Sequence, residues 1–161
     1  MTEIVNSDIC VIGAGSGGLS VASGAARMGA RTVLIEKAKM GGDCLNYGCV
    51  PSKSLLAAAR AADAIRRSDR FGVNGHEPDV DFARVHDHVH GVIGAIAPHD
   101  SQERFEGLGV EVIRESCRFI GPNEIAAGNH RIRAKRFVVA TGSSPLVPDI
   151  LGLADVPYFT N

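Results

Sequence analysis

A glycine-rich turn between a short apolar run and a helical segment is the feature that most restricts the fold of this chain. Residues 9–12 are apolar and mostly β-branched, which is typical of a strand buried on both faces of a parallel sheet. They lead directly into G-A-G-S-G-G, in which Gly13, Gly15 and Gly18 match the pattern G-x-G-x-x-G. The first glycine permits a tight turn, the second lets the backbone approach a pyrophosphate, and the third lets the helix pack on the strand. The turn therefore predicts a strand–helix unit that binds a dinucleotide.

The chain that follows completes this unit. Residues 17–28 predict a helix that ends at Gly29, and residues 32–35 predict a second strand. Glu36 stands directly after that strand, near the spacing of about 20 residues at which a carboxylate reaches the ribose hydroxyls. An acidic side chain there would repel a 2′-phosphate. We therefore expect an unphosphorylated adenosine ribose beside Glu36, with the phosphates at the N-terminus of the helix.

Two cysteines follow this unit. Residues 41–53 read GGDCLNYGCVPSK, so Cys44 and Cys49 are five positions apart. Five residues turn about 500° around an ideal helix, and a disulfide between them would need irregular backbone, for which Gly48 and Pro51 are suited. A cysteine pair alone is equally compatible with a metal site or with buried apolar thiols. Its position after a dinucleotide site favours a redox-active pair beside a flavin.

The rest of the chain predicts two long helices, of which the first should cross the sheet, and a set of short strands. Asp81 is the expected N-cap of the second helix, and Pro98 is expected to kink it. Glycines at 107 and 109 should end it, and the strands after it should form a small antiparallel meander beside a parallel sheet. The expected helices span residues 52–67 and 81–108, with a connector at 68–78 that is extended at 71–73, and the strands span 110–113, 116–120, 124–127, 131–132 and 137–140.

Composition argues against several classes of function. A chain of 161 residues can form one domain with a proper core, and a net charge of -1 gives no basic surface for nucleic acid. No run of about 18 apolar residues could span a membrane, and residues 1–7 lack the features of a signal peptide. We therefore expect a cytoplasmic protein with neither nucleic acid nor membrane as a partner, in which a disulfide is more often catalytic than structural.

Other residues that could carry chemistry have simpler interpretations. His86, His88 and His90 alternate, but on a helix only His86 and His90 share a face, and no carboxylate or cysteine joins them. We expect an exposed polar face there and no metal site. Cys10 and Cys117 fall inside predicted strands and are expected to be inert core thiols.

Together these motifs resemble the N-terminal part of the flavoprotein pyridine nucleotide-disulfide oxidoreductases, the family of dihydrolipoamide dehydrogenase, glutathione reductase and mercuric reductase. The resemblance rests on the glycine turn with Glu36, on residues 41–53, and on A-T-G-S at 140–143 after an apolar run. The residues of the second motif are most similar to those of the mercuric-reductase-like branch. The resemblance implies an α/β fold, namely a Rossmann-like FAD-binding domain with a parallel central sheet, flanking helices and a small antiparallel β-meander.

The resemblance also implies roles for individual residues. Cys44 would exchange with the substrate, Cys49 would lie against the isoalloxazine ring, and Lys53 would add positive charge near flavin N5. A helix N-terminus and a nearby cation would lower the pKa of the reactive thiol. The implied cofactor-binding residues are Gly13, Gly15, Gly18, Glu36, Gly42, Lys53, Ala140, Thr141 and Gly142.

The family has further parts for which this sequence gives no signal, since no second G-x-G-x-x-G follows. We expect residues 1–161 to be a truncated FAD-binding domain, inactive alone, without the NAD(P)H domain, the second FAD segment and the dimerisation domain. The complete enzyme would be a homodimer that uses FAD and NAD(P)H and acts on a small disulfide, a thiol or a metal ion. The alternative is a non-catalytic dinucleotide-binding module that senses redox state through its cysteine pair.

Overall fold

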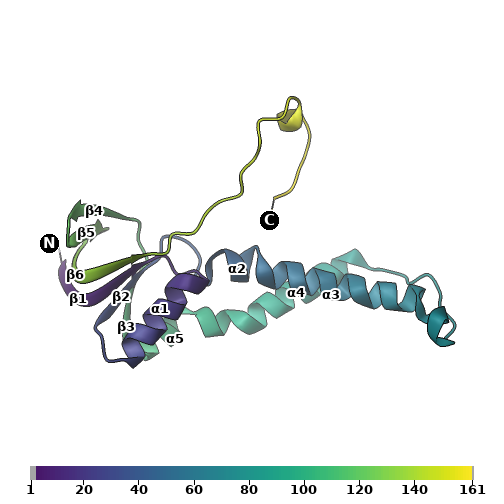
Figure 1. Cartoon of the computed structure of the whole chain (residues 1–161), viewed down its shortest axis with the longest axis horizontal. Helices are drawn as coiled ribbons and strands as arrows, with labels where there is room; N and C mark the ends of the chain where they lie inside the picture. The colour runs from purple at the N-terminus through teal and green to yellow at the C-terminus, as the bar shows by residue number, and fades with distance from the viewer. Residues whose placement is uncertain (1–2, 161) are drawn as a thin grey trace.

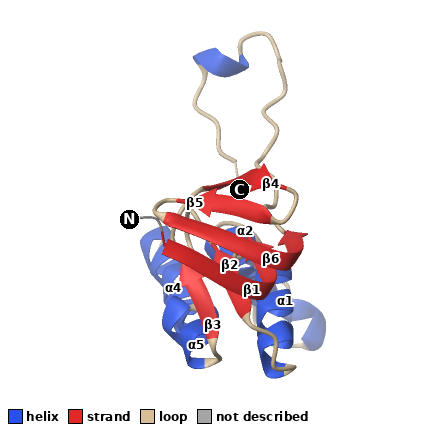
Figure 2. Ribbon diagram, turned by 90° about the vertical axis from the view of Figure 1, so that its left-hand side faces the viewer, coloured by secondary structure: helices blue, strands red, loops and turns tan. Residues whose placement is uncertain are grey.

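One strand, β1 (Glu3–Ile12), lies at the centre of the sheet and pairs with a parallel neighbour on each side. In the computed structural model, which describes residues 3–160, the strands form one six-stranded sheet in the order β3-β2-β1-β6-β5-β4 (Figure 1). Figure 2 shows the antiparallel strands β4 and β5 at the opposite end of the sheet from β3. The predicted α/β class, with parallel strands and a small meander, is confirmed. The other strands are β2 (Thr32–Ile35), β3 (Val110–Ile113), β4 (Cys117–Gly121), β5 (Glu124–Ala127) and β6 (His130–Val139).

Helix α1 (Ser16–Arg27) packs against this sheet through small side chains. Leu19, Ala22 and Ala25 are buried at the spacing of one helical face. Gly18 lies on the same side, and a Cβ at this position would be 1.8 Å from the carbonyl oxygen of Gly13. The third glycine of the motif is therefore required because the helix and the turn approach too closely for any side chain.

The core is divided between the two faces of the sheet. One cluster lies with α1 and α5 (Gln102–Gly107), and the other includes residues of the meander. Cys10 is fully buried in the second cluster, where burial raises the pKa of its thiol to about 12. Cys117 is partly buried against the same cluster, and burial raises its pKa as well. The main members are Val11, Leu19, Ala22, Leu34, Phe105 and Val110 in the first cluster and Val5, Cys10, Val33, Ile125 and Ile132 in the second.

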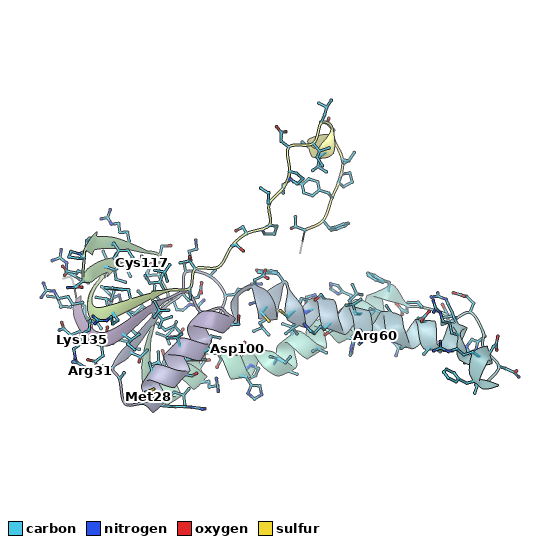
Figure 3. All side chains as sticks on the ribbon, viewed as in Figure 1. Met28, Arg31, Arg60, Asp100, Cys117 and Lys135 are labelled. Carbon is cyan, nitrogen blue, oxygen red and sulfur yellow. The ribbon has the colours of Figure 1, made fainter. Side chains whose placement is uncertain are left out.

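Asp8 connects three neighbouring segments of the sheet. Its carboxylate accepts hydrogen bonds from the backbone and guanidinium of Arg31, just before β2, and forms an ion pair at 2.7 Å with Lys135 of β6. The hydrogen bonds from Arg31 and Lys135 hold the pKa of Asp8 well below its usual range. Figure 3 shows Arg31 and Lys135 at the same end of the sheet, far from Arg60.

Several expected boundaries were wrong. Residues 130–139 form one strand rather than two, because β6 pairs antiparallel with β5 over its first half and parallel with β1 along its length. The expected helix over 81–108 is divided into α4 (Phe82–Ile96), a 3₁₀ turn (Ala97–Asp100) and α5. Asp81 caps α4 as expected, but Ser101 caps α5 anew by accepting from the Arg104 amide. Residues Ser68–Phe71 form a 3₁₀ turn closed by Gly72 at φ +75°, so the extended segment expected at 71–73 is absent there.

Two helices extend away from the sheet. The short α2 (Gly42–Asn46) is followed by α3 (Cys49–Arg66), which lies beside α4 in a long two-helix arm (Figure 1). The expectation that residues 52–67 cross the sheet was therefore wrong, because α3 packs on α4 instead. After β6 the chain runs as an extended segment with one 3₁₀ turn (Leu153–Asp155). Among residues 3–160, no helix has both the length and the hydrophobicity needed to cross a bilayer.

Two glycines of α1 provide a matched test of this packing. Gly18→Ala should lower the free energy of unfolding by about 1–3 kcal/mol, because the new methyl group overlaps the Gly13 carbonyl. Gly24→Ala should raise it by up to about 1 kcal/mol, because nothing lies within 4 Å of that position and alanine favours the helix. Urea unfolding followed by circular dichroism measures both changes. Equal effects of the two substitutions would contradict this account of the packing.

Candidate functional site

The glycine turn lies where three parallel strands end. Gly13 follows β1 at φ +105°, and its amide donates to the Ile35 carbonyl at the end of β2 over 2.8 Å. A Cβ at this position would be 2.3 Å from the Ala140 carbonyl oxygen, just beyond β6. Gly13 is thus required both by its backbone angle and by the close passage of the chain after β6. The nearest atom to a Cβ on Gly15 is the Gly42 Cα at 3.9 Å, so no steric contact within the chain requires Gly15.

Glu36, directly after β2, is hydrogen-bonded to the glycine turn. Its carboxylate accepts hydrogen bonds from the Ala14 amide at 2.6 Å and from the Ala38 amide at 2.7 Å. The side chain is nine-tenths buried, and its charge is balanced by these two amide donors. Each carboxylate oxygen has a second lone pair, so the group can still accept from a hydroxyl.

A cavity of about 740 Å³ opens beside the turn and Glu36. A second cavity of about 210 Å³ shares Gly13, Glu36, Lys37 and Thr141 with it and reaches Cys117. Gly18 lies behind the turn, outside both linings. The residues of the larger lining that the sequence predicted are Gly13, Gly15, Glu36, Gly42, Ala140, Thr141 and Gly142, and those it missed are Lys37, Ala38, Lys39, Asp43, Tyr47, Ser143, Ser144, Pro145 and Thr160.

Two of the missed residues in the cavity lining contact each other. The ammonium of Lys39 lies 5.2 Å from the ring centroid of Tyr47, within the range of a cation–π contact. Tyr47 lies between the two cysteines, and Lys39 follows Glu36 by three residues. Their positions in the sequence, close to Glu36 and to the cysteines, could have indicated that they belong to the site. The contact between the two side chains is visible only in the folded chain.

The loop with the cysteines is fixed directly onto the glycine turn. The Gly41 amide donates to the Ala14 carbonyl over 2.9 Å, and a Cβ on Gly42 would lie 2.6 Å from the Gly15 Cα. Gly42 has φ +56°, a conformation that a side chain disfavours. The side-chain amide of Asn46 donates to the Met40 and Gly42 carbonyls, which fixes the loop to α2.

The sulfur pair lies at the break between α2 and α3. The amides of Tyr47 and Gly48 both donate to the Asp43 carbonyl, which ends α2 before α3 begins at Cys49. The irregular backbone predicted between the cysteines is therefore present. It includes Gly48, whose backbone angles of φ -104° and ψ -104° are not helical. Pro51 lies in the first turn of α3, where the missing amide costs nothing.

Both cysteines are free thiols, with Cys44 half-buried and Cys49 exposed. The hydrogen bond with the Cys49 thiol raises the pKa of Cys44, and burial adds to this effect. The Cys49 backbone amide and the charge of Lys53 act in the opposite direction but do not outweigh it. The expectation that the helix N-terminus and the lysine lower the pKa of the reactive thiol is correct in direction for each of these two effects. The net pKa of Cys44 is nevertheless raised, so the expectation of a lowered pKa was wrong for this residue.

Cys44, Cys49 and Lys53 are outside the lining of both cavities. Gly42 and Asp43 line the larger cavity, and Cys44 is the next residue along α2. The sulfur pair is therefore held beside the cavity through the contact between Gly42 and Gly15. Within residues 3–160, no three His, Cys, Asp or Glu side chains gather so as to hold a metal ion.

Comparison with known proteins gives a consistent pattern. The family model described as pyridine nucleotide-disulphide oxidoreductase matches residues 7–160. A mercuric reductase from Staphylococcus aureus is 31% identical over 154 residues, covering 96% of this chain and 28% of that protein. A dihydrolipoyl dehydrogenase from Thermus scotoductus is 35% identical over 143 residues, covering 86% of this chain and 30% of that protein.

A similar fold occurs in a solved structure. The Cu(II) complex of the HOCl-induced flavoprotein disulfide reductase RclA from Escherichia coli superimposes with a TM-score of 0.74 at 24% identity, covering 93% of this chain and 31% of that one. The chain thus spans about three tenths of the length of these three proteins.

The interaction between the two thiols can be tested by alkylation. Cys49→Ala removes the hydrogen bond that raises the pKa of Cys44, so Cys44 should react faster with iodoacetamide at pH 8 than in the reduced wild-type chain. Lys53→Gln should slow the reaction, because the charge that lowers the pKa of Cys44 is lost. In the wild type the rate should keep rising above pH 9, since a raised pKa delays formation of the thiolate.

Mass spectrometry of the peptide that contains Cys44 measures these rates. Cys117→Ala is the matched control, because Cys117 does not contribute to the pKa of Cys44. An unchanged or slower Cys44 reaction in Cys49→Ala would disprove the interaction.

Proposed function

Since this chain belongs to the pyridine nucleotide-disulphide oxidoreductase family, we propose that it holds the adenosine and pyrophosphate of FAD and carries the redox-active Cys44–Cys49 pair of an NAD(P)H-dependent flavoprotein oxidoreductase. Its relatives include enzymes named mercuric reductase and dihydrolipoyl dehydrogenase. The observation that carries the proposal is the packing of Gly42 on Gly15, which joins the cysteine loop to the dinucleotide turn.

The cavity suits a dinucleotide in its size and in its polar groups. A volume of about 740 Å³ falls within the range of about 300–1,000 Å³ that is usual for cofactor sites. Gly15 is the N-cap of α1 and offers no side chain to the first helical amides, which leaves those amides available to phosphate oxygens. Gly15 leaves room for a close approach of the pyrophosphate on the side where a Cβ would lie, because the nearest atom there is the Gly42 Cα at 3.9 Å.

The lining of the cavity contains both acidic and basic side chains. Glu36, fixed by the Ala14 and Ala38 amides, is placed to accept hydrogen bonds from ribose hydroxyls. Lys37 and Lys39 line the same cavity and would offset the repulsion between this carboxylate and the phosphates. Ala140, Thr141 and Gly142 form the wall where the chain leaves β6, and we propose that this wall faces the flavin side.

When bound, FAD supplies two-electron transfer between a nicotinamide and a sulfur pair. The Cys44 thiolate would attack a substrate disulfide, forming a mixed disulfide and releasing one substrate thiol. Cys49 would then attack the Cys44 sulfur, which closes the Cys44–Cys49 disulfide and releases the second substrate thiol. Lys53 would favour this sequence, because its charge lowers the pKa of Cys44. Returning two electrons and two protons to the disulfide restores the dithiol.

The physiological substrate is proposed only as a class. A small disulfide or thiol fits the sulfur chemistry, and a metal ion is the second candidate because several relatives are named mercuric reductase. Four of the relatives are named mercuric reductase, and this chain spans 24% to 34% of their length. Because most of the complete enzyme lies outside that share, its use of NAD(P)H and its homodimeric state are likewise proposals. We further propose a cytoplasmic location, where the reducing thiol pool keeps such a cysteine pair able to cycle between dithiol and disulfide. We also propose that residues 1–161 are the FAD-binding part of the complete enzyme.

Cofactor binding to the chain itself is the first test. The purified 161 residues should bind FAD weakly, and Glu36→Gln should weaken binding by about tenfold or more because a charge-assisted acceptor is lost. Flavin fluorescence measures the affinity. Glu111→Gln, an exposed site on β3 outside both cavities, is the control and should bind as the wild type does.

The identity of the bound cofactor separates the proposal from its alternative. A colourless protein that binds NAD in place of FAD would favour a redox-sensing module without catalysis. Flavin affinity unchanged in Glu36→Gln would contradict the placement of the ribose.

The complete enzyme tests the role of Cys49. Two-electron reduction should produce a long-wavelength absorbance band from the contact between the thiolate and the oxidised flavin, and this band should vanish in Cys49→Ser. Cys44→Ser cannot form the disulfide, so it should show the band before any reduction. Persistence of the band in Cys49→Ser would refute the assignment of Cys49 as the flavin-side thiol. The isolated 161 residues should turn over no NAD(P)H, and disulfide reduction by them at the rate of a complete enzyme would contradict their role as one part of the catalytic unit.

A further inference from the structure

Helix α4 carries two histidines outside the candidate site. His86 and His90 are one turn apart and both are exposed. At 100° per residue, their side chains point in directions about 40° apart, beside a half-buried seam formed by Val85, Val89 and Ile96. Because α4 packs on α3, this seam accounts for the contact between the helices and leaves the histidines at its exposed border. The arm that contains them extends away from the sheet (Figure 1), and neither histidine lines either cavity.

The two imidazole rings bring their Nε2 atoms close together. Their Nε2 atoms are 3.0 Å apart, and the ring centroids are 4.3 Å apart with the planes tilted by 59°. Two nitrogens that bind one metal ion at about 2.0–2.1 Å, with an angle between about 90° and 110°, are themselves about 2.8–3.4 Å apart. The observed separation of the Nε2 atoms falls inside this interval.

We propose that His86 and His90 form a two-ligand site for a divalent late transition-metal ion such as Zn²⁺ or Cu²⁺. Imidazole nitrogen is a preferred ligand of these ions, and both Nε2 atoms are already at the separation that chelation requires. This separation needs no backbone movement, because His86 and His90 lie one turn apart on the same helix.

The site is open and exchangeable. Water completes the coordination, because no third His, Cys, Asp or Glu within the described chain joins the pair. His88 is two positions from each histidine, which directs its side chain about 200° away around the helix. An ion bound by two histidines one turn apart stabilises the helix, because the helical form holds both ligands together and binds the ion more tightly than the unfolded chain does.

This inference revises the expectation from sequence, which rested on the lack of a third ligand. The sequence could place the two histidines on one face, but the separation of the nitrogens depends on the rotamers in the folded arm. The same separation would also let one neutral ring donate its Nε2–H to the other, and that hydrogen bond is the competing interpretation of the geometry. The site is independent of the proposed flavoprotein chemistry.

Zinc titration of the full 161-residue chain distinguishes the two interpretations. All variants carry Cys44→Ser and Cys49→Ser, which removes the exposed thiol pair as a competing zinc ligand. Zn²⁺ is the probe because it is diamagnetic and has no redox chemistry. Isothermal titration calorimetry measures the affinity, and nitrogen-15 NMR of the histidine rings identifies the ligating atoms.

We expect saturable binding of one Zn²⁺, with Nε2 of His86 and His90 shifted and His88 unchanged. His86→Ala and His90→Ala should each weaken binding by about tenfold or more. His88→Ala is the matched control on the same helix and should stay within about twofold of the parent. Circular dichroism of each variant checks that α4 is intact.

Two outcomes would overturn the proposal. One is an equal loss of affinity in all three alanine variants, which would indicate adventitious surface binding. The other is zinc affinity unaffected by His86→Ala and His90→Ala, which would leave the pair as a hydrogen bond only.

Discussion

The contact on which this structure depends is the packing of one glycine backbone on another. Gly42 lies against Gly15 so closely that a single methyl group on Gly42 would overlap the Gly15 Cα, and the Gly41 amide donates to the Ala14 carbonyl beside it. This contact joins two segments of different chemistry, a turn that suits phosphate and a loop that carries two thiols. Without it, the sulfur pair would have no fixed position relative to the cavity.

Buried charge reinforces the same junction. Glu36 accepts from the Ala14 amide inside the turn and from the Ala38 amide in the loop that leads to the cysteines. A carboxylate that is nine-tenths buried is tolerated only with such donors, so the turn and the acid stabilise each other. The arrangement fixes the position of Glu36 before any ligand arrives, which reduces the ordering cost of binding.

The sulfur pair shows how local backbone adjusts reactivity. Gly48 breaks the helix between the cysteines, which lets the two thiols interact and raises the pKa of Cys44. The same break places the Cys49 amide and Lys53 near the Cys44 sulfur, where they lower that pKa. The balance of these effects leaves the pKa of the Cys44 thiol raised, so its thiolate forms at a higher pH than that of an ordinary cysteine.

The sequence by itself determined the strand–turn–helix unit, Glu36 and the irregular backbone between Cys44 and Cys49, because each depends on local chemistry: missing Cβ atoms, short apolar runs and a break in helical spacing. It also indicated seven residues that surround the cavity. Only the tertiary structure decided that residues 130–139 are one strand, that α3 leaves the sheet to pack on α4, and that Lys39 meets Tyr47. These features depend on contacts between segments far apart in sequence or on side-chain rotamers, and residue spacing along the chain contains no information about either.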